Sequence, residues 1–302
     1  MDKIIQENPK LKTRNPDKKN VRDQKKDKQD LEIIKEKMAN IKYKFIVISG
    51  KGGVGKSSVT VNFAASLAKK GNKVGILDAD IHGPNVPKML GVENAKPSGS
   101  NKDIVPINVS ENLQVISIAF FIPKKDDAVI WRGPMKHNLL KQFLGQVKWG
   151  KLDYLIVDLP PGTGDEALSI VHLIKNVSGA LIVTTPQDVA LLDSRKSITF
   201  CREMHVPLIG VIENMSGMVC PYCHKEINLF KTGGGERIAD EMKVPFLGRI
   251  PLDPQIVTST DEGMPFVLNN SKSSTITAFN NVASNWIKLL KNKLGESSVS
   301  VD

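Results

Sequence analysis

The sequence has few cysteines, few aromatic residues and no long hydrophobic run. Three cysteines among 302 residues cannot form the disulfide framework typical of small secreted proteins. Because no run of about 18 apolar residues occurs, the sequence predicts no membrane-spanning helix. The N-terminal residues lack both the apolar core of a secretory signal and the acid-poor, Arg-rich composition of a transit peptide. We therefore expect a soluble, cytoplasmic protein.

The positive charge is distributed unevenly along the chain. The formal net charge is +10, and residues 1–44 hold 14 Lys and Arg against 8 Asp and Glu. Residues 1–29 are polar and show no apolar periodicity, which favours a solvated arm, although a basic arm could also contact nucleic acid or an acidic partner. We expect residues 1–43 to form a basic arm with one short helix over 31–41, and residues 296–302 to form a disordered tail.

From residue 44 onward, short apolar segments alternate with segments of helical periodicity. The pattern predicts strands at 45–48, 74–77, 114–118, 154–157, 180–184, 208–212 and 246–250. It predicts helices at 59–65, 135–147, 167–174, 189–204, 234–242 and 276–290. This alternation is typical of one α/β domain, here residues 44–295, with a mostly parallel sheet and helices on both faces. The last helix is amphipathic and could lie on a membrane, but such helices more often dock on their own sheet.

The most specific motif is a phosphate loop that matches the pattern GxxxxGK[ST], namely Gly50, Lys51, Gly52, Gly53, Val54, Gly55, Lys56 and Ser57. It follows a predicted strand and opens a predicted helix, which is the context that the motif requires. Its glycines let backbone N–H groups surround phosphate oxygens, and the helix N-terminus contributes its positive dipole end. We expect Lys56 to bridge the β- and γ-phosphates of ATP and the Ser57 hydroxyl to bind Mg²⁺. Ser58 is included in the expected nucleotide-binding segment.

Carboxylates at the ends of two predicted strands support a magnesium-dependent site. Asp158 ends an apolar strand, as the acidic residue of a Walker B motif does, and we expect it to hold Mg²⁺ through water. The Gly-rich segment after Asp158 can move with the γ-phosphate. Asp78 and Asp80 end another strand, where a carboxylate could orient the attacking water or cap a helix.

Cys220 and Cys223 are spaced so that their thiolates could hold one metal centre together. Two ligands fill half of a four-coordinate site, and a two-fold dimer would supply the other half. Four thiolates suit either a [4Fe–4S] cluster or Zn²⁺. A zinc site that includes His224, a redox pair and inert loop cysteines remain as alternatives, although no helix N-terminus follows a strand here, as a redox pair requires. Cys201 lies in a helical pattern and is expected to be a buried core residue.

Lys51 directly follows the first glycine, and this makes the loop similar to the deviant Walker A motif of the SIMIBI ATPases. That class contains the ParA/MinD partitioning proteins, the nitrogenase iron protein, the arsenite-pump ATPase and the Mrp/ApbC/Nbp-type iron–sulfur carriers. The chain most resembles the Mrp/ApbC/Nbp type over about residues 44–260. The stretches that carry this resemblance are Asp78-Ala-Asp-Ile-His-Gly-Pro-Asn-Val-Pro, Trp131-Arg-Gly-Pro-Met, Asp158-Leu-Pro-Pro-Gly-Thr-Gly-Asp-Glu, Thr185-Pro-Gln-Asp-Val-Ala, Glu213-Asn-Met-Ser-Gly and Cys220-Pro-Tyr-Cys.

The resemblance implies a MinD-like P-loop NTPase fold and a nucleotide-sandwich homodimer in which Lys51 reaches the phosphates of the partner subunit. It implies that Asp80 positions the attacking water and that Asp158 opens a second switch segment. Lys51, Lys56, Asp80 and Asp158 are thus the expected catalytic residues. The resemblance also implies adenine contacts from Asn214, Pro251 and Asp253, and it favours a [4Fe–4S] cluster held by Cys220 and Cys223 of two subunits.

The expected function is that of a slow ATPase that carries an iron–sulfur cluster to apoproteins, with ATP changing the dimer geometry. The alternative is a ParA/MinD-like positioning ATPase that binds DNA or membrane. The basic arm and the amphipathic C-terminal helix favour that alternative, whereas the paired cysteines speak against it, so we expect no membrane partner and no nucleic acid. The four-cysteine N-terminal cluster of eukaryotic relatives and the small N-terminal domain of many bacterial members are absent, and we expect a minimal ATPase core.

Overall fold

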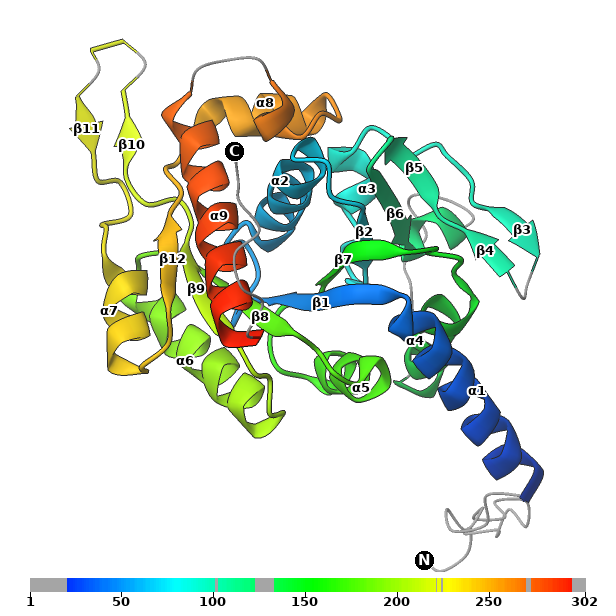
Figure 1. Cartoon of the computed structure of the whole chain (residues 1–302). Helices are drawn as coiled ribbons and strands as arrows, with labels where there is room; N and C mark the ends of the chain where they lie inside the picture. The colour runs from blue at the N-terminus through cyan, green and yellow to red at the C-terminus, as the bar shows by residue number, and fades with distance from the viewer. Residues whose placement is uncertain are drawn as a thin grey trace, which may run out of the picture.

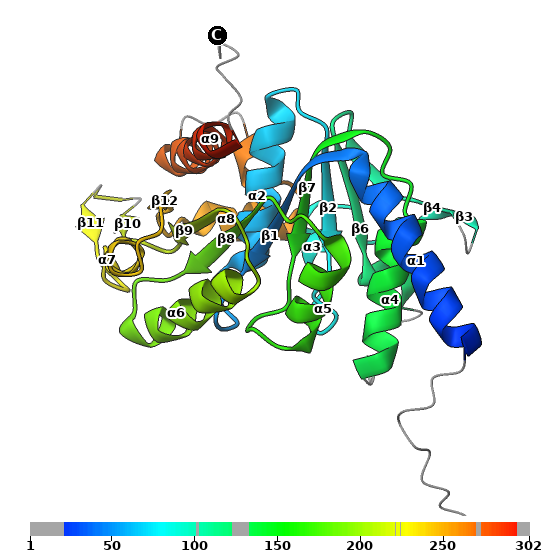
Figure 2. The ribbon, with the colours of Figure 1, turned by 60° about the horizontal axis from the view of Figure 1, so that its bottom comes forward.

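The computed structural model of the chain describes residues 21–100, 103–122, 133–220, 222–223, 225–269 and 273–294. The first half of the expected basic arm and the expected tail at 296–302 lie outside the described residues, as do Trp131, Arg132 and His224. The described residues form one α/β domain in which a twisted sheet lies between two layers of helices (Figure 1, Figure 2).

The centre of the domain is an eight-stranded sheet. Its strands, in spatial order, are β12 (Phe246–Arg249), β9 (Ile209–Glu213), β8 (Gly179–Thr184), β1 (Ile41–Ile48), β7 (Leu152–Asp158), β2 (Val74–Asp78), β6 (Leu113–Ser117) and β5 (Ile107–Ser110). All neighbours pair in parallel except β5, which is antiparallel to β6 at one edge. The central strands are buried on both faces, which explains their continuous apolar sequences. The predicted fold class is confirmed.

Helices cover both faces of the sheet (Figure 2). One face is packed by α1 (Val21–Ala39), α4 (Gly133–Gln146), α5 (Asp165–Ile174), α6 (Asp188–Glu203) and α7 (Gly234–Glu241). The other is packed by α2 (Lys56–Lys69), α3 (Val86–Met89), α8 (Pro254–Asp261) and α9 (Ser274–Leu294), with short 3₁₀ turns at Ile118–Phe121 and Phe266–Leu268. Trp286 of α9 is fully buried and meets the Phe45 ring edge-on at 5.2 Å between ring centroids, so the C-terminal helix docks on its own sheet. No described helix is long and apolar enough to cross a membrane.

The N-terminal helix differs from the sequence prediction. We expected a short helix over 31–41 within an arm ending at 43, but α1 spans Val21–Ala39 and β1 begins at Ile41. Ile34 and Met38 are only 1% and 2% exposed and belong to the same core as α4. The expected boundary between 43 and 44 therefore falls inside β1, and α1 packs on the domain. The reason is that tertiary packing of one apolar stripe stabilises a helix whose composition is otherwise highly polar.

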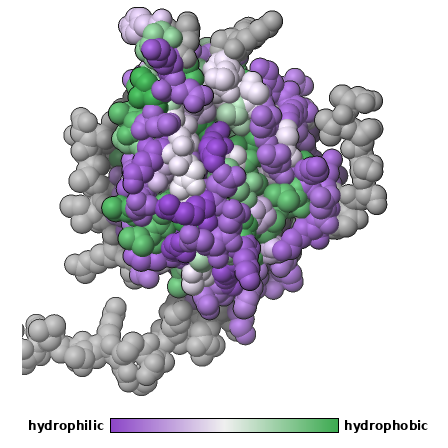
Figure 3. Space-filling view, turned by 90° about the vertical axis from the view of Figure 1, so that its left-hand side faces the viewer, coloured by the Kyte–Doolittle hydropathy of each residue, from purple (hydrophilic) through white to green (hydrophobic). Residues whose placement is uncertain are grey.

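Two small hairpins extend from the domain, and neither was predicted because strands of two or three residues are too short to show a periodic pattern. The first pairs β3 (Ser98–Ser100) with β4 (Asp103–Val105). The second pairs β10 (Met218–Val219) with β11 (Glu226–Ile227) and projects from the body of the molecule (Figure 1). We call residues 218–227 the cysteine hairpin. Figure 3 views the molecule from this side, where hydrophobic residues gather in separate areas among hydrophilic ones.

Candidate functional site

The phosphate loop lies between the carboxyl end of β1 and the first turn of α2. Gly53 and Gly55 have φ angles of 81° and 79°, in the left-handed region that favours glycine. Among the described residues, no loop or turn hydrogen bond has a backbone N–H of residues 52, 53 or 55–57 as its donor. A Cβ atom at Gly52 or Gly53 would meet nothing within 4 Å. An accessible row of unpaired donors at a helix N-terminus fits the oxygens of a polyphosphate.

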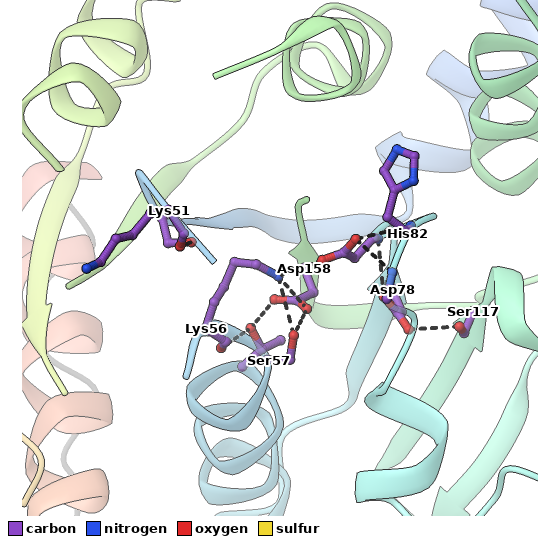
Figure 4. Close-up of polar contacts among 11 residues, drawn as sticks. Lys51, Lys56, Ser57, Asp78, His82, Ser117 and Asp158 are labelled. Carbon is purple, nitrogen blue, oxygen red and sulfur yellow. Dashed lines mark hydrogen bonds and ion pairs between the residues drawn. The ribbon is translucent and has the colours of Figure 1, made fainter. Parts of the chain in front are cut away.

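Asp158 is the centre of the polar cluster next to this loop (Figure 4). Its carboxylate is fully buried at the end of β7, and the Lys56 Nζ atom lies 2.8 Å from Oδ2. Ser57 Oγ donates to Oδ2 at 2.5 Å, and Thr60 Oγ1 donates to Oδ1 at 2.6 Å. Hydroxyl and carboxylate oxygens are the ligands that Mg²⁺ prefers, so Ser57 and Asp158 together fit the expected magnesium site. Thr60 was not predicted, although it lies one helical turn after Lys56 and therefore on the same face.

Asp80 lies in the loop that follows β2, which we call the Asp80 loop (residues 79–85). Its Oδ2 atom is 3.8 Å from Lys56 Nζ, and its Oδ1 atom accepts the N–H groups of His82 and Gly83 at 3.3 and 3.2 Å. Burial raises the pKa of Asp80, and the nearby Lys56 ammonium opposes this shift. The carboxylate therefore borders the phosphate site while its orientation is fixed by its own loop.

Asp78, the other aspartate of this motif, has a different environment. It is fully buried and accepts a hydrogen bond from Ser117 Oγ at 2.8 Å (Figure 4). Burial, reinforced by the charge of Asp158, raises the pKa of Asp78 to about 8. Asp78 thus links β2 to β6, whereas Asp80 is the aspartate beside Lys56.

Lys51 does not join the Asp158 cluster. Figure 4 shows its side chain directed away from Lys56, and no carboxylate among the described residues pairs with it. Gly50, the residue before it, lies directly against α6, because a Cβ atom there would be 2.3 Å from the backbone carbon of Asp193. The loop is therefore held by α6 on one side and continues into α2 on the other, with the Lys51 ammonium facing neither Lys56 nor Asp158.

A cavity of about 210 Å³ lies next to the phosphate loop and contains all three residues expected to contact adenine. It is lined by Gly55 and Ser58 of the phosphate-loop segment and by Asn214, Pro251 and Asp253. The Asn214 amide also donates to the Val54 carbonyl at 2.9 Å, which joins the end of β9 to the phosphate loop.

Asp253 has a structural role in this cavity wall. Its carboxylate caps α8 by accepting the Gln255 N–H at 3.0 Å, and it accepts the Thr275 hydroxyl at 2.8 Å. These bonds join α8 to the first turn of α9. An adenine contact from Asp253 remains a prediction, and the carboxylate already accepts hydrogen bonds from three protein groups, since the Ser273 hydroxyl also donates to it at 3.5 Å.

Cys220 and Cys223 lie at the tip of the cysteine hairpin, where neither thiol forms a disulfide. The Cys220 N–H donates to the Lys225 carbonyl at 2.9 Å and closes the tip. Backbone N–H groups of Cys223 and Tyr222 and the Cys223 thiol lower the pKa of Cys220. Tyr222 between them is 92% exposed. Among the described residues no group of three or more His, Cys, Asp or Glu is placed to hold a metal ion, so the described part of the hairpin offers a metal centre two thiols.

Glu213 anchors the base of the cysteine hairpin. Its buried carboxylate accepts the Gly233 N–H at 2.8 Å, the Gly235 N–H and the Ser216 hydroxyl. Arg249 Nε lies 3.7 Å away. Both ends of the segment that carries the hairpin are thus tied to the end of β9. The sequence showed Glu213 in a motif but gave no sign of this anchoring role, which needs partners about 20 residues away.

Cys201 is fully buried in the core of the α6 face, as predicted. Burial raises the pKa of this thiol to about 12, because the apolar surroundings disfavour the thiolate. Cys201 is therefore a thiol of the hydrophobic core, whereas Cys220 and Cys223 lie on the surface hairpin.

Comparisons with known proteins agree with this geometry. A family model described as NUBPL iron-transfer P-loop NTPase matches residues 40–287. The iron-sulfur cluster carrier protein of Methanocaldococcus jannaschii is 53% identical over 236 residues, which cover 78% of this chain and 81% of the relative. A nucleotide-binding protein from Archaeoglobus fulgidus, solved in complex with ADP, has a TM-score of 0.70 and 36% identity over 80% of this chain and 94% of that one.

The septum site-determining protein MinD of Pyrococcus horikoshii, solved with Mg-ADP, has a TM-score of 0.62 and 27% identity over 83% of this chain and 98% of its own. The family match covers nearly all of the described domain, and the carrier relative is far more similar in sequence than MinD. The chain therefore belongs to the NUBPL-type iron-transfer P-loop NTPases, the family of the iron–sulfur cluster carriers.

Proposed function

We propose that the chain is an ATP-hydrolysing carrier that holds an iron–sulfur cluster between two subunits and delivers it to apoproteins. The observation that carries this proposal is the cysteine hairpin, which presents two free thiols on an exposed tip. Two thiolates are half of the set that a [4Fe–4S] cluster requires, and a second copy related by a two-fold axis would supply the same two. An exposed site also suits a cluster that is delivered to another protein, because the cluster must be able to leave this one.

The nucleotide site supports ATP hydrolysis by a positioning mechanism. Ser57 and Asp158 would hold Mg²⁺, which neutralises charge on the β- and γ-phosphates. Lys56, now within 2.8 Å of Asp158, would turn to the phosphates, and the unpaired N–H groups of the loop would bind their oxygens. Asp80 would orient the attacking water from its place beside Lys56. Such a site binds and orients without covalent chemistry, which fits slow hydrolysis used as a switch.

Two surface features support a homodimer. Lys51 faces away from its own Asp158 cluster, as a residue that acts on a partner's nucleotide would. Exposed apolar side chains lie near the hairpin base, with Val189 on α6 and Leu229 just after β11. An ion pair of 3.0 Å between Asp188 and Lys231 joins these two segments. A second copy of the chain that covers them would bring the two hairpins to one interface.

Anaerobic reconstitution with iron and sulfide tests the proposal. We expect the wild type and Cys201→Ala to take up about four irons per dimer, the content of one [4Fe–4S] cluster, and Cys220→Ala/Cys223→Ala to take up none. The loaded wild type should then restore activity to an apo-[4Fe–4S] enzyme. Iron binding that survives loss of both hairpin cysteines, or zinc held tightly in place of iron, would contradict the carrier proposal.

A further inference from the structure

Three side chains from distant parts of the sequence meet beside the nucleotide site and are not used by the proposed mechanism. They are His82 in the Asp80 loop, Lys136 in the first turns of α4, and Glu166 at the start of α5. The Lys136 ammonium lies 2.8 Å from His82 Nε2 and 2.6 Å from Glu166 Oε1. His82 Nε2 and Glu166 Oε1 are 3.9 Å apart. Lys136 is therefore the shared partner of two residues on two different segments.

The chemistry of the three groups defines the contact. An ammonium group only donates hydrogen bonds, so the hydrogen bond between Lys136 and His82 uses the imidazole tautomer in which Nε2 accepts. The hydrogen bond from Lys136 is the largest cause that lowers the pKa of Glu166. The Lys136 and Glu166 side chains are only 14% and 20% exposed, so their ion pair is less screened by solvent than a surface pair.

Both segments held by Lys136 contact the nucleotide site. On one side, the His82 N–H donates to Asp80, whose other oxygen is 3.8 Å from Lys56. On the other side, Glu166 follows the loop that begins after Asp158 (residues 159–164). The Gly162 N–H of this 159–164 loop donates to the carbonyl of Ser49, next to the phosphate loop, at 2.7 Å.

The helix that carries Lys136 is fixed to the core. Leu140, Phe143 and Leu144 of α4 are almost completely buried beneath α1 and the sheet. The Asp80 loop and the 159–164 loop are irregular segments that face the phosphate site. Lys136 therefore extends from a helix fixed in the core and contacts both the Asp80 loop and the start of α5, next to the 159–164 loop.

We propose that Lys136 is a positioning residue that ties the Asp80 loop to the start of α5, so that both loops respond to the nucleotide together. This inference rests on the proposed ATPase function and adds to it a residue that touches neither nucleotide nor metal. Without Lys136, Asp80 would keep its local turn but lose its fixed distance to the 159–164 loop. Binding of the nucleotide should then be preserved while the catalytic step is impaired.

The test compares Lys136→Met with Lys148→Met, which removes a 3.2 Å ion pair to Asp103 on an exposed part of the same α/β connection. We expect Lys136→Met to lower kcat for ATP hydrolysis about 10- to 100-fold, as misplacement of a positioning group does, with nucleotide affinity changed less than about threefold. Lys136→Arg, which keeps the donors, should restore most of the rate. Lys148→Met should behave as the wild type.

Hydrogen exchange gives a second readout that does not depend on turnover. In the presence of Mg-ADP, the backbone amides of residues 79–85 should exchange faster in Lys136→Met than in the wild type. Their exchange rates in Lys148→Met should equal those of the wild type. An unchanged kcat and unchanged exchange in Lys136→Met would overturn the proposal, as would a loss of nucleotide binding equal to the loss in kcat. If the wild type hydrolyses no ATP, the proposed ATPase function fails, and the exchange comparison still decides whether Lys136 ties the loops.

Discussion

Asp158 has to be stabilised by its neighbours before it can serve a metal. A fully buried carboxylate is costly unless it is paired and hydrogen-bonded. Here the carboxylate pairs with the Lys56 ammonium and accepts hydrogen bonds from the Ser57 and Thr60 hydroxyls, and all three groups belong to the first turns of α2. The residues expected to bind phosphate and Mg²⁺ therefore also keep β7 and α2 together. Variants of Lys56 should be judged by nucleotide binding and by stability separately.

Gly50 gives a prediction at the scale of one residue. A methyl group at this position would be 2.3 Å from the backbone of Asp193, whereas one at Gly52 would meet nothing within 4 Å. We expect Gly50→Ala to lower the free energy of unfolding by about 1–3 kcal/mol, the usual cost of overpacking. Gly52→Ala should leave it within about 0.5 kcal/mol. Urea unfolding without nucleotide measures both, and equal losses in the two variants would show that α6 does not press on Gly50.

At the scale of elements, the structure makes α1 part of the domain, and one pair of adjacent isoleucines can test this. Ile34 is 1% exposed, while Ile33 is 44% exposed. We expect Ile34→Ala to cost about 2–5 kcal/mol of unfolding free energy, the range for large buried aliphatic residues, and Ile33→Ala to cost less than about 1 kcal/mol. Chemical denaturation of the full chain is the measurement. If the two variants are equally mild, the helix belongs to a loosely attached arm, as the sequence had suggested.

The strands of the parallel sheet could be predicted because each buried strand is a short apolar run that ends at a polar residue or a glycine. The strand that ends in Asp158 and the strand before the phosphate loop are examples, and both have the predicted positions within a few residues. The helices predicted from residue 56 onward also lie within a few residues of the observed ones, since their apolar residues recur at helical spacing, whereas the predicted N-terminal helix was too short. The two-residue strands β10 and β11 escaped prediction because two residues are too few to show a period.

The candidate site was predictable where a motif concentrates the chemistry in adjacent residues. Lys56 and Ser57 belong to one loop, and the structure brings Asp158 to them as expected. Contacts between single residues of distant segments were not predictable. Glu213 needs glycines about 20 residues away, and Lys136 needs two partners that only the folded chain brings together. These contacts depend on tertiary geometry, and no local pattern in the sequence records them.

At the scale of the whole molecule, the nucleotide site joins segments from most of the chain. The phosphate loop, Asp158, Asn214 and the loop at Pro251 come from four separate connections at the carboxyl ends of the strands. A ligand that contacts all four stabilises the folded state only, because the unfolded chain holds no such site. Ligand binding should therefore report on the integrity of the entire sheet.

We expect Mg-ATP at about 100 times its Kd to raise the free energy of unfolding by about 2.7 kcal/mol. Lys56→Met should abolish this increment even if its own stability differs, because it removes the phosphate-binding ammonium and keeps an apolar stem of similar length. The measurement is thermal unfolding of each protein with and without Mg-ATP, where each variant serves as its own reference. A full increment in Lys56→Met would contradict the assignment of Lys56 to the phosphates.

Two consecutive residues at the end of β9 contact two different functional segments. Glu213 grips the base of the cysteine hairpin, and Asn214 touches the phosphate loop. The strand end is buried and paired on both sides, by β8 and β12. The end of β9 thus connects the phosphate loop directly to the base of the hairpin that carries Cys220 and Cys223. A shift of the phosphate loop on nucleotide binding would therefore pass through two adjacent backbone positions to the base of the cysteine hairpin.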